Sequence, residues 1–378
     1  MTETILTNAN LVLRDRLQHG TVVVRDGVIV AIDATISHAA GAIDLEGDYL
    51  MPGVVDVHTD NLERQVQPRI NARWPSRSAM LSHDQQTAAA GVTTVLDALC
   101  LGDLGFEAER TKTFHDGVRD LDALAGTGLL KSEHFLHLRC EMPATDMLEL
   151  FEPVADHPRV RMVSFMDHSP GVGQYADIEN YRRLRRRGGM SEPEIDLRIA
   201  QLKAQREAWR RPNREALLAL VAHLDISLAS HDDQTLADID ENVADGIMIS
   251  EFPVRMEAAV AARARGMTVI AGAPNIVRGG SHSGNVGAAD LLRAGTVDAF
   301  ASDYFPAALV EAAFLCVVQC DISLPDAVAM ITDSPARMAR LPDRGRIEQG
   351  LRADLLRVRD FEGTPVVRQV WRAGERVA

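Results

Sequence analysis

Six side chains of metal-binding types stand at the carboxyl ends of apolar, strand-like runs that lie far apart in the sequence. Each is a histidine, an aspartate or a glutamate, so each offers an imidazole nitrogen or a carboxylate oxygen. The six are His58, Asp60, Glu141, His168, His231 and Asp303. Such ligands suit a divalent ion of the zinc, manganese or iron type. A lone histidine is usually a packed or surface residue, but six such residues at strand ends predict one shared metal site.

The spacing within this set suggests how the residues would divide the chemistry. One residue separates His58 from Asp60, and side chains two apart in a strand face the same way. Glu141 could bridge two ions about 3.5–4 Å apart. A bound cation makes hydroxide available near pH ~7, and Asp303 could accept the proton as a general base. We therefore predict one or two divalent ions, zinc before manganese or iron, with Asp303 as the catalytic residue.

A second polar segment, GAPNIVRGGSHSGN at 272–285, follows a later strand-like run. Its glycines let backbone N–H groups approach an anion, and Arg278 adds a positive charge. Phosphate sites in closed α/β barrels often lie in the loops after the last two strands. We predict substrate-binding roles for Arg278, Ser281, His282, Ser283 and Asn285. The alternative interpretation is an ordinary glycine-rich loop.

These side chains need a scaffold that brings strand ends together, and the pattern of the chain supplies one. Apolar β-rich runs alternate with helical segments rich in Ala, Leu and Arg, which indicates βα units around a parallel sheet. The predicted strands are 54–60, 93–99, 134–141, 160–168, 226–232, 247–252, 268–273 and 298–304. Eight such units predict an α/β fold of the (β/α)8 TIM barrel type, whose active sites lie at the carboxyl ends of the strands. An open doubly wound sheet is the alternative, disfavoured because no glycine-rich dinucleotide turn follows the first strand.

The two ends of the chain follow a different pattern from its middle. Both read as short strands with turns, and Asp26–Gly27 is a hairpin signal. We predict a small β-sandwich built from both termini, 1–50 plus 336–378, and a hydrolase barrel over 51–335. A helical insertion around 170–214 contains YRRLRRRGG. Long segments of this kind are often lids or binding elements, although a solvated helix is an equal alternative.

Composition narrows the class of protein. With 378 residues the chain exceeds the ~250 of one closed barrel, which leaves room for the accessory module. Its net charge of −14 argues against a nucleic-acid binder, which needs a basic face. Four cysteines, no basic-then-apolar leader and no long apolar run predict a cytoplasmic protein without membrane spans. A homo-oligomer is compatible with these features.

At this point the motifs resemble those of a known family. MPGVVDVHTD and GRIEQGLRADLL are similar to the amidohydrolase superfamily. More closely, HTDNLE, LHLRCEMP, MDHSPG, ASHDD, EFPV, GAPNIVRGGSHSGN and ASDYFP resemble the PhnM family of the carbon–phosphorus lyase pathway. These motifs run from the first predicted barrel strand to the last.

The resemblance implies a metal-dependent diphosphatase of phosphonate breakdown. Such an enzyme adds water to the sugar ester alpha-D-ribose 1-methylphosphonate 5-triphosphate and releases diphosphate, leaving the 5-phosphate. By motif, His58 and Asp60 take the metal pair of strand one and Glu141 the bridging carboxylate position. His168 and His231 take the single-histidine positions. One departure is His-x-Asp where most of the superfamily has His-x-His, which makes the site more anionic and leaves the metal open.

Two other functions remain in competition on the sequence alone. A C–N hydrolase, either a cyclic amidase or a deaminase, is permitted because fold does not fix function. The glycine-rich segment and the arginine-rich insertion favour a polyanionic substrate instead. A non-catalytic scaffold on a hydrolase fold is the second rival, but such proteins usually lose ligands, and this chain keeps a complete set.

Overall fold

The computed structural model describes residues 2–69, 72–105, 108–281 and 284–378, which form two sheets and their surrounding helices. One sheet consists of β6 (Val54–Thr59), β7 (Val92–Leu101), β8 (Glu133–Glu141), β9 (Val160–Met166), β10 (Ser227–His231), β11 (Ile249–Glu251), β12 (Thr268–Gly272) and β13 (Ala299–Ala301). All neighbouring pairs along this order are parallel. Each of these strands overlaps one of the eight that the sequence predicts.

The sheet of β6 to β13 closes on itself to form the predicted barrel. A parallel bridge joins Thr59 of the first strand to Asp303, just after the last strand. At the same place the Asp303 N–H donates to the His58 carbonyl oxygen at 3.0 Å. The seam of the barrel therefore lies where two of the predicted ligand positions lie, and closure of the sheet brings them together.

The barrel is filled by the apolar residues that its parallel strands carry on both faces, as expected for strands without solvent contact. Side chains such as Val55, Leu96, Met162 and Ile270 form a core cluster inside the strands. Helices cover the outside. They are α1 (Asn61–Val66), α2 (Ser76–Ala89), α3 (Ala108–Leu124), α4 (Met147–Phe151), α5 (Ile178–Arg187), α6 (Glu192–Val221), α7 (Leu236–Ala244), α8 (Met256–Ala264), α9 (Ala273–Arg278), α10 (Ala288–Arg293), α11 (Ala308–Cys320), α12 (Leu324–Ala329) and α13 (Asp333–Met338), with 3-10 turns η1 (Glu152–Val154) and η2 (Gly173–Tyr175).

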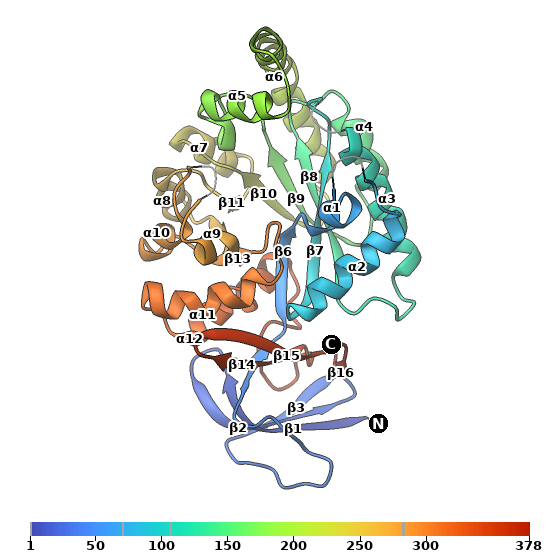
Figure 1. Cartoon of the computed structure of the whole chain (residues 1–378), viewed down its shortest axis with the longest axis vertical. Coiled ribbons are helices and arrows are strands. Elements are labelled where there is room, and N and C mark those ends of the chain that lie inside the picture. Colours follow the sequence, from blue (N-terminus) through green and yellow to red (C-terminus); the bar gives the residue numbers. More distant parts are fainter. Residues whose placement is uncertain (1, 70–71, 106–107, 282–283) are drawn as a thin grey trace.

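The insertion after β9 is helical and stands over one side of the barrel mouth. Asp177 caps α5 by accepting a hydrogen bond from the Glu179 N–H, and Ser191 with Glu194 forms a capping box at the start of α6. The 30 residues of α6 make it longer than a barrel helix needs to be, and its first half projects beyond the barrel in Figure 1. The insertion therefore adds a wall to the mouth.

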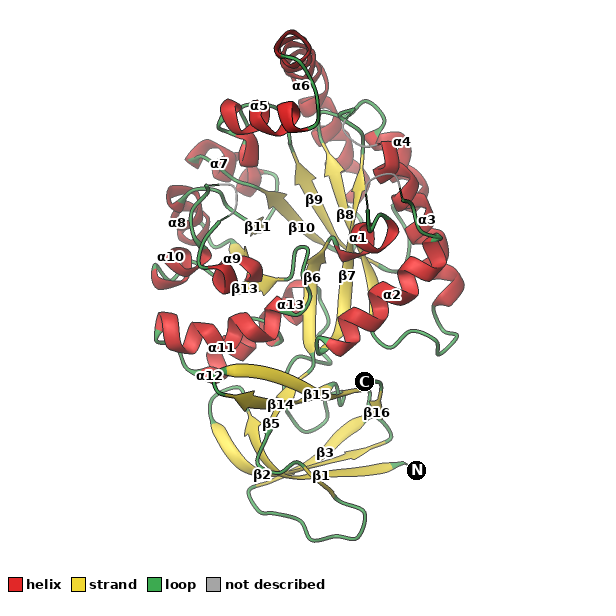
Figure 2. Cartoon of the chain, viewed as in Figure 1, coloured by secondary structure: helices red, strands yellow, loops and turns green. Residues whose placement is uncertain are grey.

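Both ends of the chain build the second sheet, the terminal sheet. Its strands are β1 (Glu3–Val12), β2 (Leu17–Arg25), β3 (Val28–Asp33), β4 (Ile43–Asp44), β5 (Tyr49–Pro52), β14 (Leu355–Phe361), β15 (Thr364–Arg372) and β16 (Glu375–Arg376). They pair in the order β16-β15-β14-β5-β1-β2-β3, with β4 beside β1. Leu6, Ile29, Leu355 and Trp371 share one core cluster, so the two ends pack against each other (Figure 2).

The boundary between the two parts differs in detail from the sequence pattern. The predicted boundary at 336 falls inside α13, which packs on β6 and β13 at the base of the barrel. The terminal sheet resumes only with β14 at Leu355. No helix within the described ranges is both long enough and apolar enough to cross a membrane.

Candidate metal centre at the barrel mouth

A cavity of about 370 Å3 opens at the carboxyl ends of the barrel strands. All six of the residues predicted as metal ligands line it, namely His58, Asp60, Glu141, His168, His231 and Asp303. They come from the ends of β6, β8, β10 and from the turns that follow β6, β9 and β13. The fold therefore brings together side chains that are distant in sequence, at the end of a barrel where catalytic groups usually lie.

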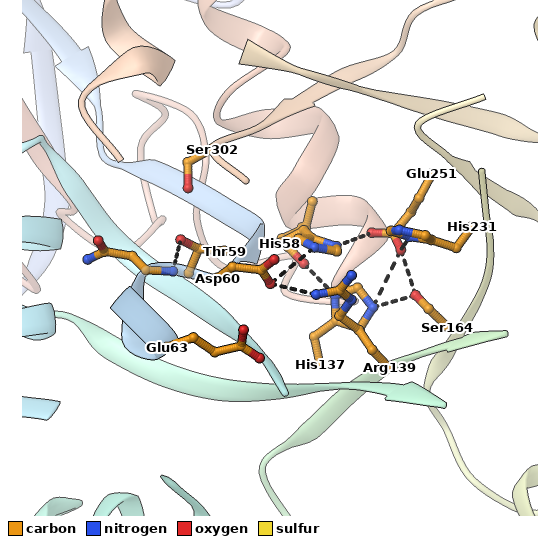
Figure 3. A network of polar contacts seen from close by, with 12 residues as sticks. His58, Thr59, Asp60, Glu63, His137, Arg139, Ser164, His231, Glu251 and Ser302 are labelled. Atoms are coloured by element: carbon orange, nitrogen blue, oxygen red, sulfur yellow. Dashed lines mark hydrogen bonds and ion pairs between the residues drawn. The ribbon is translucent and has the colours of Figure 1, made fainter. Parts of the chain in front are cut away.

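Buried carboxylates hold the three histidines of the mouth by one ring nitrogen each. His58 Nδ1 lies 3.1 Å from Glu251 Oε1, and His231 Nδ1 lies 3.4 Å from Glu251 Oε2 (Figure 3). His168 Nδ1 lies 2.8 Å from Glu141 Oε2. Because an ionised carboxylate only accepts hydrogen bonds, each Nδ1 must donate, so in the neutral ring Nε2 is the nitrogen left to bind an ion. This is the tautomer that a metal-binding histidine needs.

The three Nε2 atoms point to carboxylates at distances that suit a shared ion. His58 Nε2 is 3.7 Å from Asp60, and the Nε2 atoms of His168 and His231 are each 3.8 Å from Asp232 Oδ2. These distances are too long for hydrogen bonds. Two atoms that each bind one ion at about 2.1 Å can be at most about 4.2 Å apart, so the distances fit shared coordination.

Two groups of potential ligands result, and they lie side by side in the mouth. His58, Asp60 and Asp303 bring three ligand atoms within 4.8 Å of one another, and so do His168, His231 and Asp232. His168 Nε2 is buried without a hydrogen-bond partner in the described structure. A buried polar atom of this kind is costly unless something satisfies it. The donor set therefore fits one or two divalent ions.

Glu141, predicted as a bridging ligand, lines the cavity and contacts His168. One of its oxygens accepts from the His168 backbone N–H and the other from His168 Nδ1, both at 2.8 Å. It belongs to none of the ligand groups found among the described residues. The carboxylate therefore contacts the Nδ1 side of the imidazole and can orient it, as a partner of a metal ligand does.

Sequence reasoning missed Glu251 and Asp232. Glu251 ends the short strand β11, is fully buried, and also accepts a hydrogen bond from Ser164 at 2.6 Å. Asp232 directly follows His231 in ASHDD. The signal for both was their place at strand ends, the same criterion that selected the other six.

Backbone geometry at the strand ends turns the carboxylates into the mouth. Asp232, Phe252 and Asp303 adopt left-handed φ values of 58°, 52° and 55° directly after, or close to, the ends of β10, β11 and β13. Residues other than glycine are uncommon there and persist only where the surroundings hold them. Hydrogen bonds to the neighbouring strand do so, as from the Asp232 N–H to the Glu251 carbonyl oxygen at 2.9 Å.

The two aspartates beside His58 have opposite electrostatic surroundings. Burial alone would raise the pKa of Asp60, but the positive charge of Arg139, 2.6 Å away, and contact with His58 outweigh it and lower that pKa. Burial raises the pKa of Asp303 to about 7, and the negative charge of Asp60 adds to the shift. Asp60 is thus held ionised, while Asp303 can exchange a proton near neutral pH.

The predicted substrate-binding segment is partly helical. Residues 273–278 form α9 instead of an open loop. Ser281 and Asn285 line the cavity, whereas Arg278 lies outside its lining and donates to the Tyr304 hydroxyl at 3.4 Å. His282 and Ser283 lie outside the described residues.

A second buried histidine cluster, the α2 cluster, lies between α2 and strands β7 and β8. Asp97 accepts from His83 Nε2 at 2.6 Å and from His134 Nδ1 at 2.8 Å. Asn61 donates to His83 Nδ1 at 2.9 Å, and His134 Nε2 lies 3.2 Å from Asp84. Every ring nitrogen of this cluster therefore has a hydrogen-bond partner, as in a histidine packed in the core.

Comparison with known proteins finds a relative that matches nearly the whole chain. No family model matches it. The alpha-D-ribose 1-methylphosphonate 5-triphosphate diphosphatase of Escherichia coli (strain K12) is 41% identical over 376 residues, which cover 99% of this chain and 100% of that protein. A D-hydantoinase of Rhizobium radiobacter is 26% identical over 180 residues, 48% of this chain and 36% of that protein.

Solved structures agree on the fold. The N-acetyl-D-glucosamine-6-phosphate deacetylase of Mycobacterium smegmatis superposes with a TM-score of 0.65 at 16% identity, over 100% of both chains. A 5-methylcytosine deaminase of Klebsiella pneumoniae gives 0.64 at 16% identity, over 99% of this chain and 98% of that one. An amidohydrolase gives 0.63 at 15% identity, over 99% and 98%. At these identities the likeness supports the architecture alone.

Proposed function

The chain belongs to the PhnM family, that of the Escherichia coli diphosphatase, within the amidohydrolase superfamily, and from this we propose that its mouth hydrolyses alpha-D-ribose 1-methylphosphonate 5-triphosphate. The products are the 5-phosphate and diphosphate. The proposal rests on 41% identity to the Escherichia coli enzyme over nearly the full length of both chains. The mouth agrees with it, because three histidine Nε2 atoms there face carboxylates.

The proposed ion-binding residues are His58, Asp60, His168, His231, Asp303 and, in addition, Asp232. We assign Glu251 and Glu141 to holding the histidine rings. A divalent ion bound there supplies Lewis acidity, which makes water nucleophilic near neutral pH. Superfamily members depend on metal, and this mouth has groups that can hold one or two ions; zinc is our first choice, with manganese or iron as alternatives.

The chain's own residues manage the proton and the charge. A bond forms between the water oxygen and the α-phosphorus while the bond from that phosphorus to the bridging oxygen breaks. Diphosphate leaves with the electron pair, and Asp303 accepts the proton of the water. Its place in the cavity, beside His58 and Asp60, suits a group that takes a proton from water held at the mouth. Ser281 and Asn285 line the cavity as donors for the substrate, and Arg278, His282 and Ser283 complete the proposed binding segment.

We also propose a cytoplasmic location and a small-molecule substrate, for the protein alone or as a homo-oligomer. All four cysteines are free thiols, as expected in a reducing compartment. The net charge of −14 disfavours a nucleic-acid partner.

Hydrolysis in oxygen-labelled water, followed by phosphorus NMR, tests the function. We expect the label in the sugar 5-phosphate and none in diphosphate, because water attacks the α-phosphorus. Asp303→Asn, with bound metal measured, should turn over about 100- to 10,000-fold more slowly. The surface variant Asp122→Asn is the matched control. Label in diphosphate, or ring opening of a hydantoin without action on the triphosphate ester, would contradict the proposal.

A further inference from the structure

Two rims of the cavity carry different charge. The first, the insertion rim, comes from the loop after β7, from α3, η2 and α5; it contributes Arg110, Gln174, Tyr175 and Arg185. The second, the β12 rim, comes from the segment after β12 and contributes Asn275, Ser281, Asn285 and Val286. Figure 1 shows α5 above α7 and α9, with α3 on the other side of the barrel strands. The insertion rim carries two arginines and one acidic residue, Asp103, while the described lining of the β12 rim is uncharged.

Helical spacing sorts the arginine run of α5 into two sets. Arg182 and Arg186, one turn apart, pair with acidic residues: Arg182 donates to Glu192 at 3.0 Å, and Arg186 also bonds to Glu192. Arg185 lies on a different face of α5 from Arg182 and Arg186. It lines the cavity, and its guanidinium lies 4.9 Å from the ring centre of Tyr181, one turn earlier. Tyr181 is fully buried, so its ring is a fixed platform that orients the cation.

Arg110 reaches the same cavity from a different element. It lies in the first turns of α3, and its Nε is 3.5 Å from a carboxylate oxygen of Glu63 in α1. The third arginine of the lining, Arg139, is committed to Asp60 at 2.6 Å at the base of the mouth. Besides Arg139, the arginines that line the cavity are Arg110 and Arg185.

The charge of the substrate makes this asymmetry meaningful. Its triphosphate carries most of its negative charge, and the base of the mouth is already lined by carboxylates such as Asp60, Asp232 and Asp303. Ions at the base can neutralise the phosphate under attack, but the two phosphates that leave extend beyond them. Guanidinium groups match phosphate oxygens in charge and in the geometry of their donors.

On the basis of the proposed function, we infer that Arg110 and Arg185 form the subsite for the departing diphosphate and so select a triphosphate tail. The sugar then lies toward the β12 rim, whose amide and hydroxyl donors suit neutral hydroxyl groups. This places the polyphosphate at the cavity wall formed by α3 and α5 and the sugar at the segment 272–285.

Two substrates and one product separate this subsite from the metal centre. Arg185→Gln is compared with Arg187→Gln, an exposed arginine of the same helix that is not in the cavity lining. With Arg185→Gln we expect kcat/KM for the triphosphate ester to fall about 10- to 100-fold, the loss of a charge-assisted hydrogen bond. Binding of inorganic diphosphate, measured by calorimetry, should weaken by a similar factor. Hydrolysis of bis(4-nitrophenyl) phosphate, which lacks the tail, should be unchanged.

Further variants and outcomes make the test decisive. Arg110→Gln should behave as Arg185→Gln does, and Arg185→Lys should recover part of the affinity for diphosphate. Unchanged diphosphate binding in both glutamine variants would overturn the subsite, and so would an equal loss on the diester. If the wild-type protein bound diphosphate through these arginines without cleaving the triphosphate ester, the subsite would stand and the proposed function would fail.

Discussion

Two buried clusters of histidine and carboxylate lie in this protein, and they are built from the same residue types. In the mouth, His58, His168 and His231 each use Nδ1 on a glutamate and turn Nε2 toward a cavity. In the α2 cluster, His83 and His134 use both ring nitrogens on polar neighbours, and neither lines the cavity of the mouth. In the first arrangement one ring nitrogen of each histidine is left to bind an ion. In the second arrangement both ring nitrogens form hydrogen bonds within the fold.

The comparison shows that burial and composition do not identify a metal site. His83, Asp97 and His134 also bring three ligand atoms within 4.8 Å of one another. What distinguishes the two clusters is which ring nitrogen is satisfied, and by what. A satisfied buried network stabilises the fold, while a buried nitrogen with no partner indicates a missing ligand.

The largest expected effect is loss of bound metal. Dialysis of the protein against a chelator should lower turnover about 1,000-fold or more, because the Lewis acid contributes several kcal/mol to the reaction. Elemental analysis should show that His168→Asn loses metal and that His134→Asn keeps it. Equal metal content in these two variants would erase the distinction between the clusters.

Breaking the α2 cluster should cost stability instead. Asp97→Asn leaves two buried histidines without their shared carboxylate, and we expect the free energy of unfolding to fall by about 3–5 kcal/mol. Asp122→Asn, which removes the exposed partner of His157, should cost less than about 1 kcal/mol. Chemical denaturation measures both. If Asp97→Asn abolished turnover in protein that was still folded and metal-loaded, the purely structural role would be refuted.

A smaller effect is expected from the carboxylate behind the mouth histidines. Glu251→Gln keeps the shape of the side chain but weakens its hold on His58 and His231, so the affinity for Zn2+ should fall about 10- to 100-fold. Competition with a fluorescent chelator measures it. Asp240→Asn, a surface variant that removes a partner of Arg265, is the control. Unaltered affinity in Glu251→Gln would mean that the ring orientation does not depend on this carboxylate.

The last expected effect is a loss of folding stability as the pH becomes alkaline. Burial alone would lower the pKa of His134, but the charge of Asp97 and the bond to Asp84 raise it from 6.5 to about 9. The folded state then binds this proton more tightly than the unfolded state, so its stabilisation is complete below pH 6.5 and is lost as the pH rises through about 9. Thermal unfolding of the metal-loaded protein at pH 7 and pH 10 should show the loss. His134→Gln should show a smaller one, and an equal slope in both proteins would argue against this assignment.

The sequence predicted the barrel well because its signals are local. Each strand is an apolar run bounded by polar turns, and a polar residue that ends such a run must lie at the mouth once the strands are parallel. The last predicted strand, 298–304, is longer than β13, which ends at Ala301 because Asp303 turns left-handed. The convergence of His58, His168 and His231 on one cavity follows from the same rule.

The roles within the mouth could not be predicted in the same way. Whether a carboxylate such as Glu141 faces an ion or holds a ring depends on differences of a few ångströms across strands. Glu251 lies in the predicted strand 247–252, but one carboxylate at a strand end does not show that it faces two histidines from other strands. Likewise, the sequence does not show which face of α5 turns toward the cavity. Arg185 lines the cavity, whereas Arg182 and Arg186 bond to Glu192 of α6.

The terminal sheet has a consequence for how the molecule is assembled on the ribosome. Strand β14 pairs with β5, and Arg357 bonds to Asp48 across 309 positions of the chain. Strand β5, which is synthesised early, therefore has an unpaired edge until β14 has been synthesised near the end of translation. A chain that lacks the residues from β14 onward would present that edge to other chains, so it should aggregate although it contains every residue of the mouth.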